Sequence, residues 1–203
     1  MCGITGFYLK SGSAASNNEN LQNIHFDNLE KATKAISHRG PDDMGLFQET
    51  EIPFAMGHTR LAILDLSDLG HQPMFSKNND VVIVFNGEIY NFKELRKDLI
   101  ENGESFKSNT DTEVILRLYT LYGKSMLTKL NGIFSIAIWD KKNDSLFIAR
   151  DSFGIKPLYY IENSNGFFFS SEIKSLIKFL EDDDLKIDFE SLDRYLSFLW
   201  CPG

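Results

Sequence analysis

Residues 1–8 read MCGITGFY, which places one of the two cysteines of this 203-residue chain directly behind the first methionine. Residues 2–9 read as a β-strand. If Met1 stays attached, Cys2 is an ordinary residue at the start of that strand. If Met1 is removed, Cys2 carries a thiol and a free α-amine together. The remaining sequence has to decide between these two interpretations.

The composition restricts the classes of function. With 42% hydrophobic residues and interspersed charges, the chain is typical of a globular protein of one or at most two domains. The formal net charge of −8 argues against nucleic-acid and membrane partners, which favour basic surfaces. The longest apolar runs are too short to cross a bilayer, and the N-terminus lacks a signal-peptide pattern. Because the cysteines form no disulfide framework, we expect a protein of the reducing cytoplasm.

The hydrophobic periodicity predicts both strands and helices. The β-type runs cover residues 2–9, 54–59, 61–65, 80–86 and most of 133–170. Helical spacing covers a stretch that ends near residue 36 and residues 172–180 and 189–199. Two more helices are predicted to begin at capping pairs, Asn91 with Glu94 and Thr110 with Glu113. Residues 11–20 read as a polar loop. Together these predict sheets covered by helices, an α+β or layered α/β architecture.

Cys2 has the chemistry needed to hydrolyse a carboxamide, a reaction that requires a nucleophile and a base. A free α-amine has a pKa of about 7.7–8.0 and a thiol one of about 8.5, so the two are matched near neutral pH. The nitrogen of a Met1–Cys2 peptide bond is not basic, so this mechanism requires removal of Met1. The alternative is that Cys2 only begins a strand.

Two further stretches offer groups for such a reaction. In FNGEIYN (85–91), the Asn86 amide and the Gly87 N–H at a strand end could form an oxyanion hole, although Asn-Gly also favours a hairpin turn. In GHTRLAILD (57–65), Arg60 lies among apolar residues and needs a carboxylate partner, either an internal Asp or the α-carboxylate of an amino-acid substrate. Glu88 and Asp111 could hold the α-ammonium of that substrate, while Asp111 also suits the first turn of a helix.

Taken together, these stretches resemble the glutaminase domain of the class II, N-terminal-nucleophile glutamine amidotransferases. The matching stretches, in chain order, are MCGITGFY, HRGPDDMG, HTRLAILDLSDLGHQPM, FNGEIYN, SNTDTEVI, LNGIFSIAIWD, ARDSFGIKPLYY and SSEIKSL. Within the class, RLAILD and NGEIYN are similar to the glutamine-hydrolysing asparagine synthetase branch. The aminosugar-phosphate synthase branch would show RWATHG and HNG instead.

The resemblance implies a fold and a set of roles. The implied fold is a four-layer αββα sandwich of the N-terminal nucleophile hydrolase type, within the α+β class. Cys2 would attack the side-chain amide of glutamine and form a γ-glutamyl thioester, with Asn86 and Gly87 as the oxyanion hole. The implied glutamine-binding residues are Arg60, Leu61, Ala62, Ile63, Leu64, Asn86, Gly87, Glu88 and Asp111, with no metal.

The resemblance also implies partners outside these residues. Residues 1–203 would be the glutaminase domain at the N-terminal part of a longer protein, because LWCPG ends the chain inside a turn. Ammonia would pass to a C-terminal synthetase domain, absent here, that uses ATP and magnesium; the glutaminase domain itself needs no cofactor. A homodimer is compatible with this arrangement. The alternatives are a sugar as ammonia acceptor in polysaccharide synthesis, and a non-catalytic domain that binds an amino acid.

The remaining polar residues of these motifs are expected to be structural. Arg150 and Asp151, with Lys156, would shape a turn between the sheets and a contact between domains. His38, His58 and His71 would lie in loops near the site without metal-ligand spacing.

Overall fold

The computed structural model describes residues 1–10, 19–49, 52–180 and 185–200. Its strands are β1 (Gly3–Leu9), β2 (Asp43–Gln48), β3 (Phe54–Arg60), β4 (Met74–Phe75), β5 (Val81–Ile89), β6 (Gly132–Asp140), β7 (Ser145–Arg150), β8 (Tyr159–Glu162) and β9 (Gly166–Ser170). Its helices are α2 (Glu19–Ala35), α3 (Phe92–Glu101), α4 (Asp111–Tyr122), α5 (Ile173–Leu176) and α6 (Phe189–Phe198), with short 3₁₀ segments η1 (Ser37–Arg39), η2 (Asp68–Gly70), η3 (Gly123–Lys129) and η4 (Ile177–Phe179).

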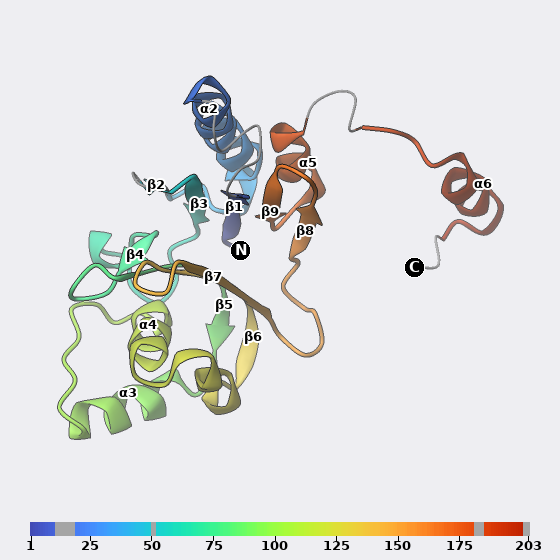
Figure 1. The fold of residues 1–203 in the computed structure, drawn as a ribbon. Helices are drawn as coiled ribbons and strands as arrows, with labels where there is room; N and C mark the ends of the chain where they lie inside the picture. The colour runs from blue at the N-terminus through green and yellow to red at the C-terminus, as the bar shows by residue number, and fades with distance from the viewer. Residues whose placement is uncertain (11–18, 50–51, 181–184, 201–203) are drawn as a thin grey trace.

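The strands form two antiparallel sheets (Figure 1). The first sheet has the order β2-β3-β1-β9-β8, so the strand that carries the N-terminus lies in its centre. The second has the order β4-β5-β6-β7, with β5 and β6 paired along their whole length. Ile4 lies opposite His58 in the first sheet, and Asn86 lies opposite Ser135 in the second.

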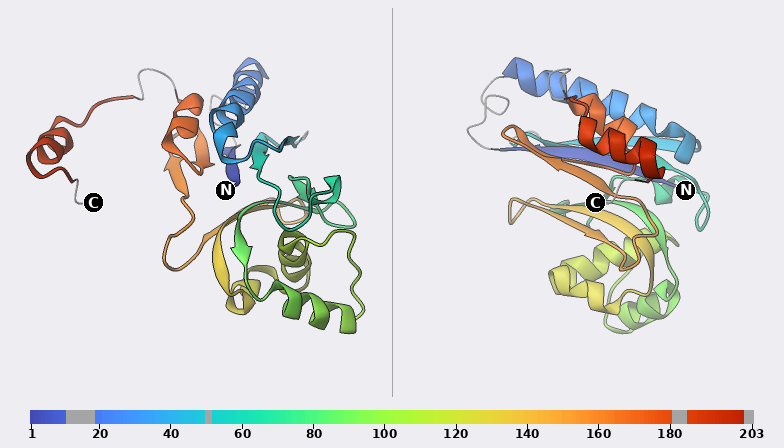
Figure 2. Two further views of the ribbon diagram at one scale, coloured as in Figure 1. Left: turned by 180° about the vertical axis from the view of Figure 1, so that it is seen from behind. Right: turned by 90° about the vertical axis from the view of Figure 1, so that its right-hand side faces the viewer.

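The sheets stack face to face, with helices on the outer face of each (Figure 2, right). Apolar side chains fill three layers: between α2, α5 and the first sheet, between the two sheets, and between the second sheet and α3 and α4. The middle layer is formed by Ile4, Phe54, Met56, Val82, Val84, Ala137, Trp139 and Phe169. This arrangement of helix, sheet, sheet and helix confirms the predicted four-layer α+β sandwich.

The run VVIVF in β5 is apolar on both sides because both faces of its sheet are covered. Val82 and Val84 face the other sheet, whereas Ile83 and Phe85 face the helices. The same alternation places the side chain of Asn86 on the face between the sheets. The polar end of this strand therefore adjoins the apolar middle layer.

Residues 61–65 were predicted as a strand, and the structure corrects this. The chain leaves the sheet after Arg60, whose guanidinium donates to the backbone carbonyls of Asp65 and Ser67. The N–H of Ala62 donates to Asp42 Oδ2 at 2.8 Å and not to a neighbouring strand. Side-chain hydrogen bonds thus replace the ladder that the β-type sequence suggests.

The helix caps follow the predictions only in part. The Asn91 side chain makes no capping bond; it instead donates to the Lys129 carbonyl and accepts from the Asn131 N–H. Thr110 does cap α4, since its hydroxyl oxygen accepts from the Glu113 N–H at 3.2 Å. Of the predicted polar loop at 11–20, residues 11–18 lie outside the described part of the chain, and α2 begins at Glu19.

The last helix, α6, stands apart from the sandwich (Figure 1; Figure 2, left). Its apolar side chains are largely exposed: Phe189, Leu192, Tyr195, Leu196 and Phe198. None of the helices in the described ranges combines the length and apolarity needed to cross a membrane.

Candidate active site

A pocket of about 170 Å³ lies where the start of β1 meets β5 and the first turn of α4. Nine of the ten residues predicted to form the site line it: Cys2, Arg60, Leu61, Ile63, Leu64, Asn86, Gly87, Glu88 and Asp111. The exception is Ala62, which is held by Asp42 outside the lining. Cys2 and Asp111, which are 109 positions apart in the sequence, therefore line the same pocket.

The Cys2 thiol is partly buried and held by the backbone of Leu61. The Leu61 N–H donates to Sγ at 3.4 Å, and its carbonyl oxygen lies 3.8 Å from the same sulfur. Arg39 Nε donates to the Cys2 carbonyl at 2.9 Å, and the same guanidinium pairs with Glu172 at 3.0 Å. Burial raises the pKa of the thiol, and the Leu61 N–H partly opposes this. With Met1 attached, the nitrogen of Cys2 is an amide.

Arg60 is buried in the lining of the same pocket, and no carboxylate in the described ranges lies within ion-pair distance of its guanidinium. Its partners are the carbonyl oxygens of Ser67, at 2.9 Å, and Asp65. Gly70 makes room for the guanidinium, because a Cβ at this position would lie 2.0 Å from Nη2. Such a cation is suited to bind an anionic group that enters the pocket.

The N–H groups of Phe85, Gly87 and Ile89 in β5 point to the side of the strand away from β6. The Phe85 N–H donates to Gln72 Oε1 at 2.7 Å, and the Ile89 N–H donates to Asp111 Oδ2 at 3.1 Å. Gly87 lies opposite Phe134 of β6, whose N–H and carbonyl both bond to Asp151. Gly87 and Phe134 are therefore a non-hydrogen-bonded pair of the ladder, and the Gly87 N–H points away from β6.

The Gly87 N–H thus lies between two engaged N–H groups, and no side chain or loop carbonyl in the described ranges accepts from it. Only glycine fits here, since a Cβ would meet the Ile133 carbonyl oxygen at 2.3 Å. This placement corrects the prediction of a strand end or a hairpin turn at Asn86-Gly87, because β5 continues to Ile89.

Three buried polar atoms without hydrogen-bond partners lie near this part of β5, between the sheets. Asn86 Nδ2, His58 Nδ1 and Ser135 Oγ have no hydrogen-bond partner among the residues that the structure describes. His58 lies in β3, contrary to the predicted loop position, and its Nε2 is 3.1 Å from the Phe85 carbonyl. Burial lowers the pKa of His58 to about 3, so the ring is neutral and donates to that carbonyl. The Asn86 amide, which lines the pocket, retains an unused donor.

Asp111 is buried at the first position of α4, beside Glu88. Burial raises the pKa of its carboxyl to about 6, the Ile89 N–H opposes this shift, and the charge of Glu88 adds to it. The two acids lie on the same pocket as Arg60. The pocket therefore offers a cation and two acids, a charge pattern complementary to a small zwitterion.

Replacing Asp111 by Asn is expected to stabilise the fold above pH 6. The folded pKa of about 6 exceeds the ordinary 3.8, so ionised Asp111 costs up to about 3 kcal/mol above that range, and this cost vanishes toward pH 4. Asn can still accept from the Ile89 N–H. Urea unfolding at about pH 4 and about pH 8 measures the difference. The matched control is Asp193→Asn on the exposed face of α6; an equal or opposite pH dependence in the two variants contradicts the assignment.

Arg150 and Asp151 fix the turn between β7 and β8, as predicted. The Asp151 carboxylate accepts four N–H groups, from Phe134, Phe153, Ile155 and Lys156. Arg150 Nε donates to the Lys156 carbonyl at 2.7 Å. Lys156 departs from the structural expectation in one respect, because its buried side chain lines the pocket.

His38 and His71 lie outside the pocket lining. His38 is 2.9 Å from Glu172, and His71 is 2.7 Å from Asp43. In the described part of the chain, no three His, Cys, Asp or Glu side chains are grouped to hold a metal ion.

Several pocket residues were not identified from the sequence. They are Met1, Asp65, Gly70, Gln72, Phe85, Thr110 and Thr112. Gln72 links two walls, accepting from the Phe85 N–H and donating to the Thr112 hydroxyl at 3.2 Å. Asp65 joins the loop after β3 to the loop before α4 by accepting from the Asn109 N–H at 2.9 Å. These residues support the walls through long-range contacts that a local motif does not indicate.

Comparison with solved structures supports this fold. The glutamine phosphoribosylpyrophosphate (PRPP) amidotransferase from B. subtilis, complexed with ADP and GMP, superposes with a TM-score of 0.67. The match covers 88% of this chain and 43% of that one, at 21% sequence identity, so the likeness concerns the fold.

Comparison with known sequences identifies relatives over the whole chain. Asparagine synthetase (glutamine-hydrolyzing) 1 of Bacillus subtilis is 39% identical over 203 residues, and a putative asparagine synthetase (glutamine-hydrolyzing) 2 of Methanocaldococcus jannaschii is 37% identical over 220. The chain spans only 30% and 40% of the lengths of these two proteins. The family model for the glutamine amidotransferase domain matches residues 1–203. Because the match covers the whole chain, this chain belongs to the glutamine amidotransferase domain family.

Proposed function

We propose that this chain hydrolyses the side-chain amide of glutamine to glutamate and ammonia through a thioester on Cys2. The observation that carries the proposal is a pair of unused donors on the pocket that holds the Cys2 thiol. They are the buried Asn86 Nδ2 and the N–H of half-buried Gly87, which points away from β6 and has no acceptor among the described residues. An unpaired buried donor is costly to the fold and is most simply explained by a ligand oxygen that it binds. Two such donors beside a nucleophile match the requirements of acyl transfer.

The proposed reaction begins after Met1 has been removed and the Cys2 nitrogen has become a free amine. The amine takes the thiol proton, and the sulfur attacks the amide carbon of glutamine. Asn86 and Gly87 stabilise the negative oxygen of the tetrahedral intermediate. The amine then donates the proton to the departing nitrogen, ammonia leaves, and water hydrolyses the thioester to glutamate.

In this proposal, the charged groups of the pocket hold the two ends of the amino acid. Arg60 binds the α-carboxylate, since it has a buried charge and no carboxylate partner in the described ranges. Glu88 and Asp111 bind the α-ammonium. Asp111 has to be ionised for this, and its pKa of about 6 places the loss of substrate binding below that pH.

We further propose that the ammonia supplies a synthetase domain that makes asparagine in the cytoplasm. The names of the two relatives support asparagine as the product, and their greater length leaves room for the second domain. ATP and magnesium would belong to that domain, because amide hydrolysis through a thioester requires neither. Cys2, the free thiol on which the reaction depends, is suited to a reducing compartment.

The decisive experiment incubates the protein with an electrophilic glutamine analogue, such as a diazoketone. We expect one adduct, located on Cys2 by peptide mapping, in molecules whose intact mass shows loss of Met1. Glutamine should protect against labelling. An adduct at another residue, or glutamine binding by calorimetry without glutamate release from processed protein, would favour a non-catalytic amino-acid-binding domain.

A further inference from the structure

A second pocket, of about 330 Å³, lies between β4, the loop before α4, and α4 itself. One side is apolar and consists of Leu69, Met74 and Phe75. The other side carries Lys77, Lys107 and Arg117, which we call the three-cation cluster. This pocket shares no lining residue with the pocket of Cys2.

Arg117 is buried, with 5% of its surface exposed, yet its donors are largely unused. Its guanidinium has five N–H donors, but it makes a single hydrogen bond with the described residues, from Nη2 to Glu113 Oε1 at 3.3 Å. Nε is fully buried without a hydrogen-bond partner among the described residues, and it lies 3.9 Å from Glu104 Oε2, beyond hydrogen-bond distance. A buried cation in this state has capacity for a further acceptor.

The two neighbouring carboxylates are already occupied. Glu113 accepts from the N–H groups of Lys107 and Ser108 and from the Ser108 hydroxyl, at 2.7–3.1 Å. Burial raises the pKa of Glu113, but these hydrogen bonds and Arg117 outweigh it and lower the value, so Glu113 stays ionised. Glu104 forms an ion pair with the Lys77 ammonium at 3.3 Å.

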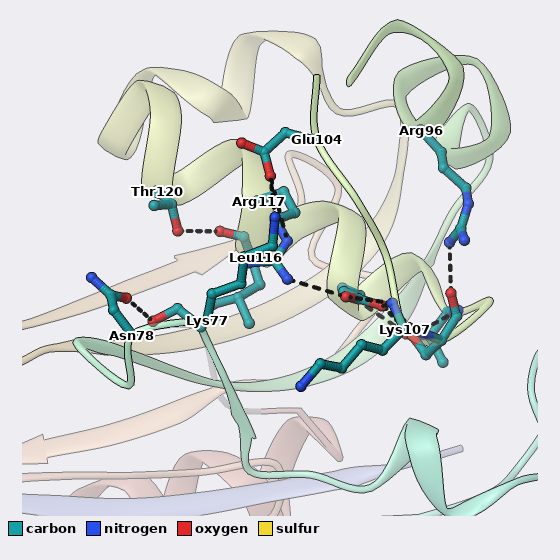
Figure 3. A network of polar contacts seen from close by, with 12 residues as sticks. Lys77, Asn78, Arg96, Glu104, Lys107, Leu116, Arg117 and Thr120 are labelled. Carbon is teal, nitrogen blue, oxygen red and sulfur yellow. Dashed lines mark hydrogen bonds and ion pairs between the residues drawn. The ribbon is translucent and has the colours of Figure 1, made fainter. Parts of the chain in front are cut away.

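Lys107 is the least compensated member of the cluster. Figure 3 shows Lys77 and Arg117 both directed at Glu104, whereas the Lys107 ammonium ends without a marked contact. No carboxylate in the described ranges forms an ion pair with it. The three cations of the cluster face only the carboxylates of Glu104 and Glu113. One net positive charge therefore remains beside the apolar side of the pocket.

We propose that this pocket binds a small amphipathic anion, a carboxylate or phosphate group carried on an apolar body. Arg117 and Lys107 would hold the anionic group, because a guanidinium fork and an ammonium both suit its oxygens. Leu69, Met74 and Phe75 would contact the apolar body. The inference goes beyond glutamine hydrolysis and does not depend on it, since no residue of the Cys2 pocket takes part.

The test uses benzoate and phenyl phosphate as probes, with benzamide as the uncharged counterpart of benzoate. Titration of the full chain, followed by calorimetry and by NMR chemical shifts, should show saturable binding of an anionic probe. Benzamide should bind at least about tenfold more weakly, as expected for loss of a charge-assisted contact. The ratio of the two anionic affinities distinguishes a carboxylate from a phosphate site. Equal binding of benzamide, or no saturable binding, would overturn the proposal.

Substitutions locate the binding. Lys107→Glu, on an exposed side chain that can change without loss of the fold, should weaken the anionic probe by about tenfold or more. Arg117→Lys keeps the positive charge but loses the paired N–H donors of the guanidinium, so it should also weaken binding of the anionic probe. The matched control, Lys31→Glu on α2 at the opposite outer layer, should leave it unchanged. An equal effect of Lys31→Glu and Lys107→Glu, or loss of binding after Cys2 has been alkylated, would place the anion elsewhere and contradict the proposal.

Discussion

A Cys2→Ala variant is expected to lose glutamine hydrolysis almost completely. Removing the nucleophile of a covalent mechanism lowers kcat by on the order of 10⁴-fold or more, because no thioester can form. Glutamate release under saturating glutamine measures the loss. The fold should be unaffected, since the thiol is only partly buried and its two contacts are to the backbone of one residue, Leu61.

Two controls separate lost chemistry from lost binding. Cys2→Ser keeps a weaker nucleophile on the same backbone and should retain a small residual rate. Calorimetry should show that Cys2→Ala still binds glutamine, because Arg60, Glu88 and Asp111 are intact in that variant. An active Cys2→Ala variant would remove the proposed mechanism, whereas loss of glutamine binding would mean that the thiol shapes the pocket.

The individual strands and helices were predictable because their signals are local. Runs such as VVIVF predict a strand covered on both faces, and β5 is such a strand. The pairing of β1 with β9, however, joins residues more than 150 positions apart, as in the pair Thr5 and Ser170. No periodicity within a strand specifies such a partner, so the resemblance to a known family supplied the four-layer arrangement.

The errors arose where side chains bond to the backbone at long range. Residues 61–65 have β-type composition, but Asp42 and the Arg60 guanidinium take the hydrogen bonds that a strand would need. Asn91 looked like a helix cap, yet its amide bridges Lys129 and Asn131. Asp42, Lys129 and Asn131 lie outside the window that a capping or strand pattern covers.

The motifs and the resemblance predicted nine of the residues that line the pocket, but not the residues that support its walls. Cys2, Asn86 and Asp111 each stand in a recognisable stretch of sequence. Gly70 and Gln72 also lie in a matching stretch, HTRLAILDLSDLGHQPM. The stretch does not indicate their roles, because neighbours set them: the Arg60 guanidinium against Gly70, and the Phe85 N–H and Thr112 hydroxyl around Gln72. Contacts of this kind become visible only when the sheets are in register.

Asn86→Ala is expected to lower kcat by about 10²–10³-fold, the usual cost of removing one oxyanion donor. The effect should fall on kcat more than on KM, since the amide is needed when charge develops on the oxygen and Arg60 still binds the substrate carboxylate. The steady-state rate of glutamate release gives both parameters.

The free energy of unfolding of Asn86→Ala should show that its lower kcat does not come from a less stable fold. Asn86 is 1% exposed, and its Nδ2 has no partner among the described residues, so its replacement removes an unsatisfied buried donor and partly offsets the lost packing. We expect the free energy of unfolding to change by no more than about 1 kcal/mol. The matched control is Asn91→Ala, which loses two backbone contacts away from the pocket and should keep its rate. If Asn91→Ala and Asn86→Ala lower kcat equally, or if Asn86→Ala keeps the parental kcat, the amide at position 86 does not face the reacting oxygen.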